Sequence, residues 1–392
     1  MDLNSFFEPA SSAVVDYRSR EFHPMLGDRI AAHVEGGSLP EWEEADLVLM
    51  GVGEDRGSAD GPGCAVAPDY IRHYLYRLSP PHADMRIVDL GNLARGVEVK
   101  DTYYALTEAL VALLDKGKTV VLLGGSQDLV FPIYKAYEAL GRVINICSVD
   151  SDFNLEGGDT VQSNNYLQHI ILQQPNYLFD YVALGYQSYF VGPEMVSLME
   201  DLKFSTRRLG EVQASMGNTE PLVRYSDVMA VDVNAVRQGD APANAYPSPH
   251  GLYGEQVCQL ARFAGMSDKT STFALFGMVP GLDRDGQTAH MLAHAIWYFV
   301  EGFYYRMDDF PHQSPQHYKR FTVELQDHKM SIAFYKSLKS DRWWMEVPCD
   351  DAERRARYGR HTLVPCNYSD YQQALGNAVP DLWWHYYNRI NN

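Results

Sequence analysis

Two short acidic stretches carry the residue types most able to do chemistry in this chain. The first spans residues 148–154 and the second residues 230–234, and each follows an apolar run and ends in alternating Asp and Asn. The carboxyl ends of buried parallel strands meet at one edge of a sheet, where α/β proteins hold ligands and metals. We therefore expect both stretches to line one pocket. Carboxylates there suit a divalent cation, whereas Asn and Gln carry no charge to offset it.

The elements that position these stretches are predicted from apolar runs that alternate with segments of helical periodicity. The apolar runs are continuous, which is typical of strands covered on both faces. Strands are predicted over residues 46–52, 86–90, 118–124, 143–150, 181–185, 207–209, 227–233 and 271–278. Helices are predicted over residues 68–78, 102–115, 128–140, 193–202, 251–263 and 287–305. This order predicts a three-layer α/β/α fold with a mostly parallel sheet of about eight strands and right-handed crossovers.

The pattern changes after about residue 309. Three short strands are predicted there, over residues 318–325, 329–336 and 342–347. We therefore predict an α/β domain over residues 1–309, with its core at about 45–305, and a C-terminal extension over 310–392. Four rings lie close together in the tail of the extension: Trp383, Trp384, Tyr386 and Tyr387. They either pack the tail onto the core or anchor a protein partner.

The composition limits the classes of partner. A net charge of −18 over 392 residues repels phosphate and anionic lipid, so we expect neither nucleic-acid binding nor membrane insertion. The five cysteines are dispersed and form no CxxC pair, which argues against a disulfide framework or a zinc ribbon and favours a reducing compartment. The N-terminus lacks the basic and apolar regions of a signal peptide. We therefore expect a cytoplasmic protein.

Several segments, taken in order, resemble motifs of the arginase (ureohydrolase) family, which includes agmatinase and formimidoylglutamase. They are Gly51–Glu54 with Gly61–Arg72, Leu122–Gln127, Val149–Asn154, Val231–Asn234 with Asp240–Ala243, and His250–Glu255. These segments are similar to the first-strand turn of the family with its GP-x-x-IR stretch, and to its LGGDHS, DAHxD, DxDxxDPxxAP and GGLxYRE motifs. The order and spacing match over roughly residues 45–305, and the C-terminal extension lies outside the resemblance.

The resemblance implies a fold, an activity and a set of site residues. The family hydrolyses guanidino or formimidoyl groups with two bridged manganese ions, held by two His and four Asp. The positions that match these ligands are Gln127, Asp150, Asp152, Asn154, Asp232 and Asn234. Both histidines are replaced, by Gln127 and Asp152, and two of the aspartates are replaced by Asn. The proton-shuttle His of the family maps near Asn164, and its guanidinium-binding Glu maps to Glu255.

These departures leave three hypotheses. The first is a non-catalytic homologue that lacks the two-manganese site and acts by binding, as a scaffold, a regulatory subunit or a small-ligand sensor. It expects no catalytic residue, metal or cofactor, because Asn relieves the repulsion between carboxylates that no cation separates. The second is an active hydrolase of non-peptide C–N bonds, with manganese or another divalent cation on Asp150, Asp152 and Asp232. The third is a protein partner on the aromatic tail. Since the family forms trimers and hexamers, the resemblance also implies a homo-oligomer.

Overall fold

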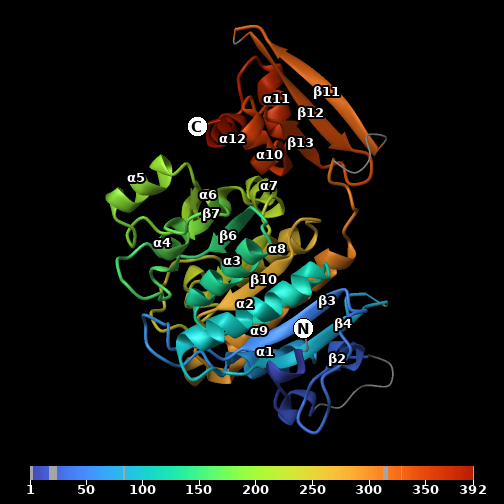
Figure 1. Cartoon of the computed structure of the whole chain (residues 1–392), viewed down its shortest axis with the longest axis vertical. Helices are drawn as coiled ribbons and strands as arrows, with labels where there is room; N and C mark the ends of the chain where they lie inside the picture. Colours follow the sequence, from blue (N-terminus) through green and yellow to red (C-terminus); the bar gives the residue numbers. More distant parts are fainter. Residues whose placement is uncertain (1–2, 17–23, 83, 312–316, 328, 392) are drawn as a thin grey trace.

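A computed structural model describes the chain except residues 1–2, 17–23, 83, 312–316, 328 and 392 (Figure 1). Its largest element is a ten-stranded sheet. The strands are β1 (Phe7–Glu8), β2 (Ile30–Ala32), β3 (Leu47–Val52), β4 (Ile87–Leu93), β5 (Thr119–Leu123), β6 (Ile144–Val149), β7 (Leu178–Tyr186), β8 (Ser205–Arg208), β9 (Val228–Asp232) and β10 (Thr272–Phe276). They lie in the order β1-β4-β3-β5-β10-β9-β6-β7-β8, with β2 also paired to β4. Strand β1 is antiparallel to β4, and the other pairs are parallel.

Helices cover both faces of this sheet. On one face lie α1 (Ala67–Leu75), α8 (Gly254–Gly265) and α9 (Gln287–Tyr304). On the other face lie α2 (Val99–Asp115), α3 (Val130–Ala139) and α4 (Tyr166–Ile171). The remaining helices of this part are α5 (Pro193–Asp201), α6 (Leu209–Ala214) and α7 (Glu220–Arg224). No helix among the described residues is both long enough and apolar enough to cross a bilayer.

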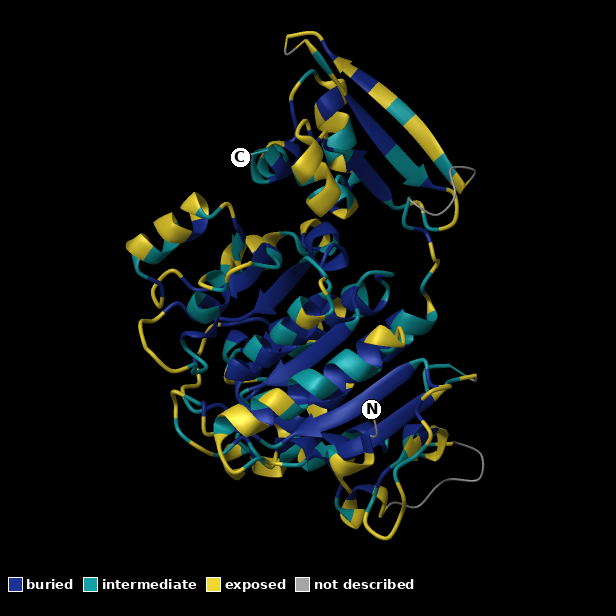
Figure 2. Ribbon diagram, viewed as in Figure 1, coloured by how far each residue is buried: buried dark blue, intermediate teal, exposed yellow. Residues whose placement is uncertain are grey.

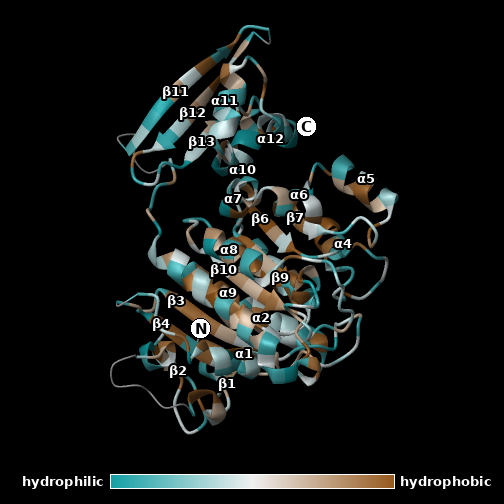
Figure 3. Cartoon of the chain, turned by 180° about the vertical axis from the view of Figure 1, so that it is seen from behind, coloured by the Kyte–Doolittle hydropathy of each residue, from teal (hydrophilic) through white to brown (hydrophobic). Residues whose placement is uncertain are grey.

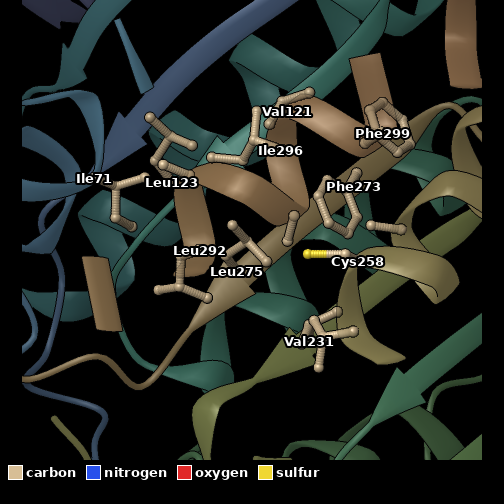
Figure 4. Close-up of a cluster of buried hydrophobic side chains, with 14 of the residues drawn as sticks. Ile71, Val121, Leu123, Val231, Cys258, Phe273, Leu275, Leu292, Ile296 and Phe299 are labelled. Atoms are coloured by element: carbon tan, nitrogen blue, oxygen red, sulfur yellow. The ribbon is translucent and has the colours of Figure 1, made fainter. Parts of the chain in front are cut away.

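The continuous apolar runs explain these layers. Successive side chains of a strand point to opposite faces, so Leu122 and Leu123 of β5 enter different cores. Figure 4 shows the core beneath α9, where Phe273 of β10 stacks on Phe299 with ring centroids 4.6 Å apart. The central strands of the large sheet are buried and hydrophobic, whereas the outer surfaces of the helices are exposed (Figures 2 and 3). The predicted three-layer α/β/α fold is confirmed.

All eight predicted strands of the large sheet are present, as β3 to β10. Strands β1 and β2 were not predicted, because two or three residues are too few to show a periodic pattern. They extend the sheet beyond β4, at its N-terminal edge.

The C-terminal extension forms a second, antiparallel sheet. Its strands, in spatial order, are β11 (Tyr318–Leu325), β12 (Met330–Ser337), β13 (Trp343–Glu346) and β14 (Leu363–Cys366). Three helices accompany it: α10 (Ala352–Tyr358), α11 (Tyr368–Leu375) and α12 (Asp381–Asn391). In α12, Trp383 and Tyr386 are buried and Trp384 is 41% exposed. Most of the aromatic surface of the tail therefore packs within the chain, and a partner on the tail stays a prediction.

The extension contacts the large sheet at the amino ends of its strands. The Tyr386 hydroxyl donates to the Asp180 carboxylate at 2.9 Å, near the start of β7. The Tyr225 hydroxyl donates to the His361 carbonyl at 2.8 Å, just before β9 begins. Since the acidic stretches follow the carboxyl ends of β6 and β9, the extension lies at the opposite end of the sheet from them (Figure 1).

Candidate functional site

The two acidic stretches meet in one cavity of about 280 Å³. It lies at the carboxyl ends of β5, β10, β9 and β6, which are consecutive neighbours in the sheet. All six positions expected as ligands line it: Gln127, Asp150, Asp152, Asn154, Asp232 and Asn234. Residues that are more than a hundred positions apart in the sequence thus share one pocket, because parallel strands present their carboxyl ends at the same edge.

Asp232 ends β9 and is buried. Its Oδ1 accepts the backbone N–H of Asn234 at 2.8 Å. The neighbouring strand provides the space for this carboxylate, since a Cβ added to Gly277 would lie 2.7 Å from both of its oxygens. Gly277 also has φ +79°, a conformation that favours glycine. Burial raises the pKa of Asp232 well above its ordinary value, and the charge of Asp150 raises it further.

Asp150 follows β6 and is the second buried carboxylate of the pocket. Its Oδ1 accepts the backbone N–H of Ser151 at 2.6 Å, and its Oδ2 accepts the Asn154 Nδ2 at 2.7 Å. Burial raises the pKa of Asp150 to about 6, against the lowering effect of the Asn154 hydrogen bond. Asp150 and Asp232 are therefore two desolvated carboxylates that repel each other, an arrangement that a bound cation stabilises.

The amide of Asn154 occupies a central position between these groups. Asn154 has φ 55°, in the left-handed region that Asn tolerates better than most residues. Its Nδ2 donates to Asp150 and also to the Gln127 Oε1 at 3.1 Å. The Gln127 Nε2 in turn donates to the Ser148 hydroxyl at 3.3 Å, which turns Oε1 toward the pocket. Gln127 and Asn154 are thus hydrogen-bonded to each other.

Asp152 differs from the other two aspartates. It is half-buried, and its Oδ1 accepts the backbone N–H groups of Phe153 and Asn154, so local backbone holds it. Among the described residues, no three His, Cys, Asp or Glu side chains come together as a metal-binding group. The charged donors that remain for a cation in the depth of the pocket are Asp150 and Asp232.

The outer part of the pocket contains groups that the sequence did not single out. Asp60, Glu156 and Asn244 line it, together with the expected Asn164. The Asn164 Nδ2 donates to the Glu156 Oε2 at 2.6 Å. Glu156 lies two residues beyond the first acidic stretch, which is the one signal that pointed to it, whereas Asp60 and Asn244 lie in loops with no such pattern.

Glu255, expected at the substrate pocket, lies elsewhere. It is exposed in the first turn of α8 and lines a separate cleft between α8 and α9, with His290 and Tyr298. Glu255 was expected at the substrate pocket because of the motif His250–Glu255, which precedes and begins α8. The loop before α8 directs this side chain away from the carboxyl ends of the strands.

Comparisons with known proteins agree with this architecture. A model of the arginase family matches residues 45–301. The chain is 24% identical to a formimidoylglutamase of Macrococcus caseolyticus over 268 residues, 66% of this chain and 85% of that protein. It is also 24% identical to a formimidoylglutamase of Staphylococcus aureus over 284 residues, 68% of this chain and 88% of that protein.

Solved structures share the fold. A Trypanosoma cruzi formiminoglutamase with Mn²⁺ has a TM-score of 0.66 at 18% identity, over 73% of this chain and 100% of that one. The formimidoylglutamase of Bacillus subtilis also has a TM-score of 0.66, at 16% identity, over 74% of this chain and 95% of that one. The resemblance seen in the sequence is thereby confirmed. The expectation of no metal cofactor is wrong, because it was drawn from charge alone and structures of this fold contain Mn²⁺.

Proposed function

Because the chain belongs to the arginase family, we propose that it is a metal-dependent hydrolase of non-peptide C–N bonds in small amidine or guanidine substrates. The observation that carries the proposal is the pair of buried carboxylates, Asp150 and Asp232, that face one cavity at the carboxyl ends of β6 and β9. No Lys, Arg or His is among the described residues that line this cavity, so a cation from outside is the natural counter-charge.

The donor set fits one divalent ion. The carboxylates of Asp150 and Asp232 balance two positive charges, and the Gln127 and Asn234 amides add neutral oxygens. Oxygen donors of this kind suit Mn²⁺, Mg²⁺ or Ca²⁺. A closely spaced pair of ions needs more negative charge than two buried carboxylates supply, and imidazole ligands are absent from the described lining. We therefore propose a single cation, held by Asp150 and Asp232.

A bound divalent cation supplies the charge that lowers the pKa of a water molecule and polarises the carbon to be attacked. The residues of the chain perform the other tasks. Asn234 and Ser151 hold the carboxylates of Asp232 and Asp150 through their backbone N–H groups. Glu156 is a carboxylate at the outer part of the pocket, and we assign it acceptance of a proton from the attacking water and its return to the leaving nitrogen.

The test is turnover by the purified full-length chain. Formimidoylglutamate, arginine and agmatine are offered with Mn²⁺, Mg²⁺ or Ca²⁺, and ammonia, formamide or urea release is measured. We expect turnover with at least one pair of substrate and ion, near one metal per chain by elemental analysis. Asp232→Asn should abolish turnover and keep the far-ultraviolet circular dichroism of the parent, because the substitution nearly preserves shape.

A matched control is Glu255→Gln, which removes a carboxylate that the structure places outside the pocket. It should leave the rate unchanged. If no guanidino or amidino compound is hydrolysed with any of the three ions, the proposal of catalysis is wrong.

One observation favours a second candidate, a family member that binds its ligand without hydrolysing it. The Asn154 Nδ2 already donates to Asp150 and Gln127, so an amide N–H group fills part of the role of a cation. This candidate predicts ligand binding without turnover, and the same assay combined with a binding isotherm separates it from the first.

A further inference from the structure

The described wall of the pocket carries charge of one sign. Besides Asp150 and Asp232, three acidic residues line it: Asp60, Asp152 and Glu156. No basic residue is among the described lining residues, so a cation on the two deep carboxylates leaves these three uncompensated. An amidinium, guanidinium or ammonium group is attracted to such a wall. A carboxylate on the ligand is repelled by it.

Asn244 supplies an independent sign of a ligand. This residue lines the pocket and is 2% exposed. Its Oδ1 accepts the backbone N–H of Tyr246 at 2.9 Å, which fixes the orientation of the amide. In the described part of the chain its Nδ2 has no acceptor. A buried donor without an acceptor is destabilising, so Asn244 points to an acceptor atom on a bound molecule.

Asn164 has the complementary property. Its Nδ2 donates to Glu156, so its Oδ1 is the free acceptor of the amide. This oxygen is buried and has no donor among the described residues. Asn164 therefore offers an acceptor for an N–H group, beside the carboxylate of Glu156 that stabilises a positive charge.

We propose that the pocket takes a small organic cation that also carries a neutral hydrogen-bond acceptor and no carboxylate. Its cationic N–H groups bind Glu156 and the Asn164 oxygen, and its acceptor, an amide carbonyl or a hydroxyl, binds the Asn244 Nδ2. This inference rests on the proposed function and narrows its substrate class. The proposed ligand differs from the glutamate derivative that the names of its relatives suggest as a substrate.

Binding isotherms of the full chain test this inference, with and without one equivalent of Mn²⁺. Two probes carry no carboxylate: γ-guanidinobutyramide has a cation and a neutral acceptor, and butylguanidine has the cation alone. The two carboxylate probes are γ-guanidinobutyrate, which has a cation and a carboxylate, and formimidoylglutamate. We expect the amide to bind about threefold to tenfold more tightly than butylguanidine, the value of one hydrogen bond. The two carboxylate probes should bind at least about tenfold more weakly than the amide.

Two variants assign the contacts. Asn244→Ala should abolish the advantage of the amide over butylguanidine and leave butylguanidine binding unchanged. Glu156→Gln, at an exposed position that tolerates substitution, should weaken binding of both cations and narrow the discrimination against γ-guanidinobutyrate. The second variant keeps the test valid if the first fails to fold.

The outcomes of the two proposals are distinguishable. If the amide binds and no guanidino or amidino compound is hydrolysed with any of the three ions, the proposed catalysis is wrong and this inference is supported. Hydrolysis of formimidoylglutamate supports the proposed catalysis and overturns this inference. Binding of either carboxylate probe more tightly than the amide also overturns this inference. Absence of binding by every cation at millimolar concentration also overturns it.

Discussion

Restoring the family carboxylate at Asn154 is the most direct perturbation of the pocket. In the parent chain the Asn154 Nδ2 donates to Asp150 at 2.7 Å and to Gln127 at 3.1 Å. Asn154→Asp removes this nitrogen and places a third negative charge beside two buried carboxylates. We expect the metal-free variant to be less stable than the parent, and the metal-bound variant to regain the difference.

The size of the effect follows from the two hydrogen bonds. A hydrogen bond to a charged group contributes about 1.5–3 kcal/mol and a neutral one about 0.5–1.5 kcal/mol, so their loss should cost about 2–4.5 kcal/mol in the free energy of unfolding. Repulsion between the introduced carboxylate and Asp150 would add to this cost, and protonation of one carboxyl would limit it. A cation at a thousandfold excess over its Kd returns about 4 kcal/mol.

Urea unfolding in EDTA measures the loss of stability in the metal-free variant, and urea unfolding in MnCl₂ measures the stability that the cation returns. The control is Asn164→Asp, the same substitution in the same pocket, where the lost hydrogen bond goes to the exposed Glu156 and solvent screens the new charge, so we expect a smaller loss than at Asn154. If Asn154→Asp unfolds at the urea concentration of the parent in EDTA, the amide does not have the electrostatic role assigned to it. If Mn²⁺ fails to stabilise the variant more than the parent, the cation does not bind at Asp150.

Three further predictions rest on contacts described above. Gly277→Ala places a methyl group against the Asp232 carboxylate and strains φ +79°, so it should lower the free energy of unfolding by about 1–3 kcal/mol and weaken Mn²⁺ binding, measured by calorimetry. Because burial raises the folded-state pKa of Asp150 to about 6, above its unfolded value, its contribution is present at pH 4 and is lost as the pH rises through 6. The metal-free chain should therefore lose stability over this window, and Asp150→Asn should flatten the profile. Tyr386→Phe removes the hydrogen bond to Asp180 and should cost about 1.5–3 kcal/mol in unfolding while the KM of any substrate stays unchanged.

The sequence predicted the fold well where burial is complete. Strands β3 to β7, β9 and β10 were visible because both of their faces are covered, which leaves a nearly continuous apolar run. Strand β8, at the edge of the sheet, has the sequence STRR and is only partly buried, so its pattern in the sequence is weak. Strand β14 was not visible, since four residues that include Pro365 and Cys366 carry little β-propensity of their own. It is a strand because it pairs with β13, a contact that local pattern does not encode.

The predicted residues that the structure brings together lie mostly at or near strand ends, whereas other residues of the same pocket come from loops. Gln127, Asp150 and Asp232 each lie within four residues of a strand terminus, so the strand pattern placed them. Asn244 reaches the same pocket from a long loop whose path depends on tertiary packing. Glu255, in the first turn of α8, lines the cleft between α8 and α9, and local sequence does not show which cavity the start of a helix faces.

Several polar residues of the pocket depend on one another. Asn154 donates to Gln127, Gln127 is held by Ser148, and Gly277 leaves the space that Asp232 fills. Gln127 provides the oxygen that the Asn154 amide needs, so the two residues stabilise each other. Residues in one hydrogen-bond network are not additive in their effects on stability. Counting ligands one position at a time therefore misjudges this pocket, because what it binds depends on how its amides are oriented by each other as well as on how many carboxylates remain.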